Sequence, residues 1–191
     1  MPYWCLSQKG MVLKMIMKSE RQNILTIILF IVYALLLTGV ILFKLPFYSA
    51  EFSDGIRVIN LIPLQGSFDG NGVVWREIIQ NILIFVPLGI YISMLKSKWS
   101  FVKKILPIIG IAFAFEVIQF IFAMGRSDIT DLLGNVLGGI IGIEIYALLY
   151  KILKCRTGLI VNILALAVTV CVLLWFGHLF YLSHFVMRRR G

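Results

Sequence analysis

The chain has 191 residues, of which 60% are hydrophobic and only 14% are charged. Soluble globular domains are about half apolar and about a quarter charged, so this composition excludes an ordinary soluble domain. The net charge of +9 would suggest a nucleic-acid partner in a soluble protein, but a membrane protein gathers Lys and Arg in its cytoplasmic loops. Three cysteines, Cys5, Cys155 and Cys171, contain no close pair and predict neither a disulfide framework nor a metal site.

Five apolar stretches are long enough to cross a bilayer, which requires about 20 residues per helix. The predicted spans are residues 24–43, 78–95, 105–124, 129–150 and 159–182. We therefore expect an all-α fold, a polytopic bundle of about five transmembrane helices. The expected parts are a cytoplasmic tail at 1–22, a membrane domain at 23–156 with an outer loop at 44–75, and a fifth span with a basic tail at 157–191.

The basic residues predict the orientation of the helices. Of the 18 Lys and Arg residues, the N-terminal tail, the 96–104 loop and the 151–156 segment hold eleven, and these three regions fall on one side of the membrane. Cytoplasmic loops are enriched in such residues, so the N-terminus is expected in the cytoplasm. Five spans would then leave Arg188, Arg189 and Arg190 outside, and a re-entrant last segment is the alternative.

Polar side chains enter the predicted membrane from three stretches, all on the outer side in this topology. They are Glu77, Gln80 and Asn81, then Glu116 and Gln119, then Arg126, Asp128, Asp131 and Asn135. At 1.5 Å per residue, Glu116 lies about 12 Å below the outer end of its helix and Asn135 about 9 Å below the start of the next. The sequence therefore predicts one shared polar layer.

Small residues on the fourth predicted helix favour close packing. Gly134, Gly138 and Gly142 recur at every fourth position, a spacing that lets a neighbouring backbone approach closely. Asp131 and Asn135 share this helix face, and Glu116 and Gln119 share a face of the third helix. We expect these two faces to meet.

Two interpretations of the polar layer stay open. In the structural one, Arg126 neutralises a carboxylate and the amides join the helices. In the functional one, the surplus carboxylates are compensated by protonation, by a cationic group on a ligand or by a hard cation such as Mg²⁺ or Ca²⁺. Catalytic residues are unknown and neither a metal ligand set nor a cofactor is assigned, although a divalent cation at the acidic cluster stays open.

The segment from Glu77 to Tyr150 resembles the VanZ family of small bacterial membrane proteins. The resemblance lies in NILIFVPLG from Asn81, EVIQ from Glu116 and RSDITDLLGNVLG from Arg126. An outer-loop NLIP from Asn60 fits as well. The combination of these motifs is specific and covers about half of the chain.

The resemblance implies a multi-pass protein of the bacterial cell membrane that reduces susceptibility to teicoplanin-type glycopeptide antibiotics, which bind cell-wall precursors outside the membrane. We expect it to act without catalysis, by binding a membrane lipid, a lipid-linked precursor or a lipoglycopeptide at the outer leaflet. No nucleic acid is expected as a partner. One alternative is an intramembrane hydrolase or transferase that acts on lipid-linked envelope precursors. The other is a small transporter or a proton or ion path.

Overall fold

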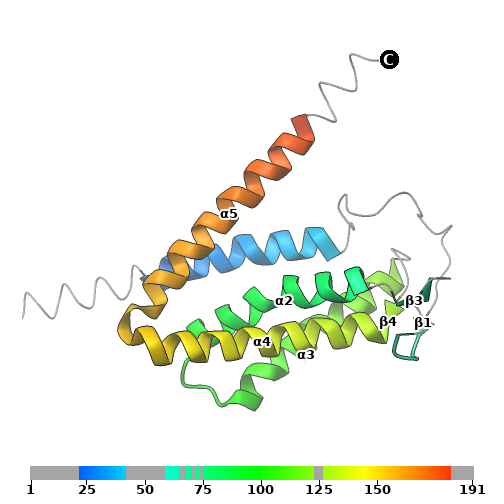
Figure 1. Cartoon of the computed structure of the whole chain (residues 1–191), viewed down its shortest axis with the longest axis horizontal. Coiled ribbons are helices and arrows are strands. Elements are labelled where there is room, and N and C mark those ends of the chain that lie inside the picture. Colours follow the sequence, from blue (N-terminus) through cyan, green and yellow to red (C-terminus); the bar gives the residue numbers. More distant parts are fainter. Residues whose placement is uncertain are drawn as a thin grey trace, which may run out of the picture. The chain divides into compact units, whose positions relative to one another are not determined.

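The computed structural model describes residues 22–41, 59–64, 68–69, 72–73, 75–122 and 127–181. This part of the chain contains five long helices: Gln22–Ile41, α2 (Trp75–Leu95), α3 (Phe101–Ile121), α4 (Ile129–Leu153) and α5 (Thr157–Tyr181). It also contains four strands of two residues each: β1 (Ile59–Asn60), β2 (Phe68–Asp69), β3 (Gly72–Val73) and β4 (Ser127–Asp128). The expected all-α helix bundle is confirmed (Figure 1).

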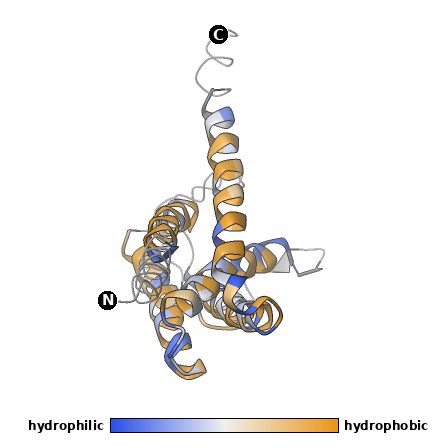
Figure 2. Cartoon of the chain, turned by 90° about the vertical axis from the view of Figure 1, so that its left-hand side faces the viewer, coloured by the Kyte–Doolittle hydropathy of each residue, from blue (hydrophilic) through white to orange (hydrophobic). Residues whose placement is uncertain are grey.

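The helices are long and apolar enough to cross a membrane. Four continuous segments qualify within the described residues: Gln22–Ile41, Trp75–Leu95, Phe101–Ile121 and Ile129–His178. The last has 50 residues and holds both α4 and α5, which a 3-10 turn at Lys154–Arg156 separates. Figure 2 shows apolar residues along most of each helix. Which side of the membrane each end faces stays a prediction.

The helix ends differ from the predicted spans by a few residues. α3 begins at Phe101 rather than at residue 105, because Ser100 has extended backbone angles and marks the helix start. α4 continues past Tyr150 and ends at Leu153, and the residue after it, Lys154, has a φ of 49°. Apolar runs mark only the part of a helix suited to hydrocarbon, whereas backbone hydrogen bonding extends the helix beyond it.

The chain divides into two compact units. One unit is Ala34–Lys154, and the other combines Met1–Tyr33 with Cys155–Gly191. In the second unit, Asn162 of α5 donates from Nδ2 to the Thr26 hydroxyl at 2.9 Å, and both side chains are buried. This hydrogen bond joins α5 to the first helix within that unit.

Backbone contact between α2 and α4 organises the Ala34–Lys154 unit. A Cβ atom on Gly138 would collide with the Ile82 carbonyl oxygen, and one on Gly142 with the Val86 carbonyl oxygen. Gly89 of α2 lies equally close to the backbone of α4. Because α2 supplies its own glycine, the two backbones pack directly against each other, and Figure 1 shows the helices side by side. The expectation that these α4 glycines meet α3 is therefore wrong.

The third helix completes the core of this unit. Phe85, Ile108 and Ala112 are fully buried. Phe85 of α2 meets Phe115 of α3 edge to face, with ring centroids 6.4 Å apart. Phe115 directly precedes Glu116 in the sequence. The apolar packing of α3 on α2 therefore places the Glu116 side chain in the interior.

Candidate functional site at the start of helix α4

A short parallel bridge brings the outer loop to the α3–α4 connection. β1 pairs with β4, so that Ile59 lies opposite Ser127 and Asn60 opposite Asp128. Figure 1 shows these two strands together at one end of α4. The bridge places the 59–64 segment beside the first residues of α4.

Asp128 stands at the centre of the site and both of its carboxylate oxygens accept hydrogen bonds. Oδ1 accepts from the backbone N–H of Thr130 at 2.8 Å, which makes Asp128 the N-cap of α4. Oδ2 accepts from Asn60 Nδ2 at 2.9 Å. A negative charge at a helix N-terminus is stabilised by the helix dipole and by the first unpaired N–H groups. Asp128 therefore both caps the start of α4 and holds the 59–64 segment through Asn60.

Glu116 and Gln119 connect α3 to its neighbours. Glu116 Oε2 accepts from the backbone N–H of Asp128 at 3.1 Å, and the side chain is only 7% exposed. Gln119 Nε2 donates to the carbonyl oxygen of Ile41 at 3.1 Å and so pairs a carbonyl at the end of the first helix. Both side chains therefore form hydrogen bonds with the backbone of neighbouring segments.

A second set of hydrogen bonds holds the 59–64 segment. Thr130 Oγ1 accepts from the backbone N–H of Leu64 at 2.9 Å, and Thr130 is buried. Asn60 Oδ1 accepts from the backbone N–H of Ile62 at 3.2 Å. The segment is therefore fixed at both of its ends to the start of α4.

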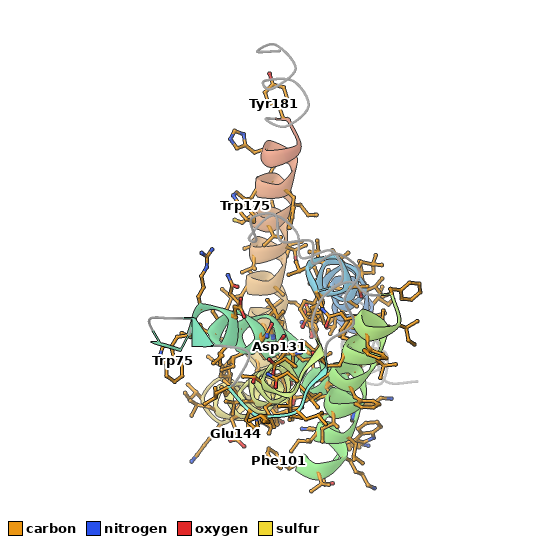
Figure 3. The ribbon with its side chains drawn as sticks, turned by 90° about the vertical axis from the view of Figure 1, so that its right-hand side faces the viewer. Trp75, Phe101, Asp131, Glu144, Trp175 and Tyr181 are labelled. Carbon is orange, nitrogen blue, oxygen red and sulfur yellow. The ribbon has the colours of Figure 1, made fainter. Side chains whose placement is uncertain are left out.

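On the other side of α4, Asp131 faces α2. Asn81 Nδ2 donates to Asp131 Oδ1 at 2.6 Å, and Figure 3 shows Asp131 among polar side chains. A Cβ atom on Gly134 would lie 3.4 Å from that of Asn81, so the small residue allows this approach. Glu77 and Gln80 are half-buried in the first two turns of α2.

Asn135 lies one turn beyond Asp131 and differs from the rest of the cluster. It is 3% exposed, and its Oδ1 atom is buried without a hydrogen-bond partner. Buried polar atoms in native proteins are almost always paired, and an unpaired one costs about 1–3 kcal/mol. Among the described residues of the predicted cluster, Asn135 is the one with a buried side-chain atom that has no hydrogen-bond partner.

The structure joins the predicted site residues in two groups. Glu116 contacts Asp128, and Asn81 contacts Asp131, whereas Arg126 lies outside the described residues. The described residues contain no group of three or more His, Cys, Asp or Glu that could hold a metal ion.

Sequence reasoning left out two members of the site, Asn60 and Thr130. Asn60 belongs to the NLIP motif, but a pairing across 68 positions leaves no local pattern. Thr130 is the second residue after an Asp that precedes an apolar helix, and the N-cap pattern could have marked it as part of a helix start.

These features define an α-helical protein with several membrane-length helices and a polar cluster at the start of one of them. A family model described as VanZ/LLP1 matches residues 30–153, and the chain belongs to this family. It is similar to Protein VanZ of Enterococcus faecium, with 36% identity over 120 residues, which are 62% of this chain and 71% of that protein. No solved structure matches the chain. The family match includes every described residue of the candidate site.

Proposed function

We propose that this protein acts at the outer leaflet of the bacterial cell membrane and lowers susceptibility to teicoplanin-type glycopeptide antibiotics. It does so by binding a membrane lipid, a lipid-linked cell-wall precursor or the acylated drug in the polar layer at the start of α4. Family membership supports a role in glycopeptide susceptibility, and the membrane-length helices support a location in the membrane.

The proposed binding site rests on the Asn135 Oδ1 atom, which is buried and has no hydrogen-bond partner. A ligand that donates a hydrogen bond, through an amide, a hydroxyl or an ammonium group, would satisfy this oxygen. Asp131 lies one turn earlier on the same face of α4, where its Oδ1 atom accepts from Asn81 Nδ2. Glycopeptides and cell-wall precursors are both rich in amide and hydroxyl donors.

The hydrogen bonds of the two buried carboxylates favour binding over catalysis. A general base must lie within hydrogen-bond reach of the proton that it removes, and each hydrogen bond that a carboxylate accepts from the protein occupies one of its lone pairs. Both oxygens of Asp128 accept hydrogen bonds from the protein, and Oε2 of Glu116 accepts from the backbone. These groups serve the architecture, so purified protein should not turn over labelled polyprenyl-linked precursors. Turnover that disappears in Glu116→Gln would instead favour the enzyme alternative.

The role is tested by expressing the chain in a susceptible Gram-positive host. The inhibitory concentration of teicoplanin should rise more than that of vancomycin, because only teicoplanin carries an acyl chain that shares the bilayer with the protein. An empty vector is the control. Equal shifts for the two drugs, or no shift for either, would contradict the proposal.

A further inference from the structure

The 59–64 segment presents apolar side chains outward. Leu61 is 73% exposed, Ile62 is 59% exposed and Leu64 is 38% exposed. The segment LIPL (residues 61–64) with its preceding Ile59 and Asn60 contains no charged residue, although Arg57 and Asp69 lie close by in the sequence. Three large aliphatic residues within four positions are therefore exposed together, and we refer to them as the apolar patch.

The patch is held in place by the protein and is not a loose loop. Thr130 and Asn60 fix the backbone of Leu64 and Ile62 through hydrogen bonds. Leu64 has φ of 67°, a left-handed conformation that glycine adopts without cost and leucine does not. The hydrogen bond from the Leu64 backbone N–H to Thr130 Oγ1 helps to hold this strained conformation.

The position of the patch points to its partner. It is attached to the start of α4, and exposed apolar residues continue from there along the helices. Leu133 of α4 is 53% exposed, and Trp75 at the start of α2 is 61% exposed. Tryptophan and aliphatic residues at the end of a spanning helix lie at the boundary between headgroups and acyl chains.

We propose that Leu61, Ile62 and Leu64 insert into the interface of the lipid bilayer, so that the segment anchors the start of α4, beside the polar cluster, in the membrane. The occupant of the patch is lipid. This inference goes beyond the proposed function and does not depend on it, since the depth of a side chain in a bilayer is measured without any antibiotic.

The test uses nitroxide labels in vesicles of phosphatidylcholine and phosphatidylglycerol. Leu61→Cys and Ile62→Cys are each made in a chain whose natural cysteines are replaced by serine. Collision rates with oxygen, which concentrates in the bilayer, are compared with those of a water-soluble nickel chelate. Leu137→Cys, at an exposed apolar position on α4, is the lipid control, and Ser97→Cys, in the turn between α2 and α3, is the aqueous control.

Labels at positions 61 and 62 should give oxygen-to-nickel ratios at least threefold above the Ser97 control and close to the Leu137 control. Ratios equal to the Ser97 control would overturn the inference.

A second measurement covers the case in which the serine replacements lower the yield of folded protein. Leu61→Trp in the chain with its natural cysteines should add emission that brominated lipid quenches. Added emission that aqueous iodide quenches, and brominated lipid does not, would also overturn the inference.

Discussion

The contact between α2 and α4 makes Gly138→Ala the sharpest test of the packing. The new Cβ atom would overlap the carbonyl oxygen of Ile82, which is backbone and cannot rotate away. The helices must therefore separate, and overpacking of this kind costs about 1–3 kcal/mol or more. Alanine returns up to about 1 kcal/mol through its helix propensity, so the observed loss is smaller than the steric cost.

Gly110→Ala is the matched control, because a Cβ atom at that position on α3 meets nothing within 4 Å. It gains the same propensity without the collision, so its melting temperature in detergent should equal or exceed that of the wild type. With a net loss of about 1–2 kcal/mol, Gly138→Ala should melt lower by about 2–8 °C, at about 2–4 °C per kcal/mol for a protein of this size. Equal melting of the two variants would refute direct backbone packing of α2 on α4.

Two further predictions concern hydrogen bonds. Asp128→Asn should lower the stability by about 1–3 kcal/mol, because an amide at this position cannot accept from both Asn60 and Thr130. Adding Asn60→Asp restores an acceptor and should recover most of the loss in thermal unfolding; a double variant no more stable than the single one would contradict this pairing. Thr26→Val and Asn162→Leu should be coupled by about 0.6 kcal/mol, and by no more than about 1.7 kcal/mol, in a double-mutant cycle of unfolding in lipid. Strictly additive losses would show that their hydrogen bond contributes nothing.

Much of the helical architecture could be predicted from the sequence. Apolar runs near 20 residues give the helices directly, since backbone in hydrocarbon must satisfy its own hydrogen bonds. The spacing of Gly134, Gly138 and Gly142 predicts a close neighbour but not its identity, which depends on Gly89 in a different helix. A local sequence pattern describes one face of one helix. Which other helix packs against that face depends on how well the surfaces of the two helices fit together.

The sequence predicts several of the polar residues that belong to the candidate site, but it does not predict the hydrogen bonds among them. Polar residues on apolar helices predict a shared layer because each needs a partner. The pairing of Asn60 with Asp128 and of Thr130 with Leu64 depends on a two-residue bridge between distant segments, which no periodicity encodes. The role of Arg126 stays a prediction, because that residue lies outside the described part of the chain.

The most direct test of the account is the inhibitory concentration of teicoplanin for cells that express Asn135→Leu. Replacing Asn135, whose buried Oδ1 atom has no hydrogen-bond partner, by an apolar side chain of similar size removes a desolvation cost of about 1–3 kcal/mol. The variant should therefore melt at or above the wild-type temperature and yet lose the resistance. Leu137→Ala, at an exposed position on the same helix, is the control and should keep the resistance at an equal membrane level. Full resistance in Asn135→Leu would contradict the claim that a ligand binds in this polar layer.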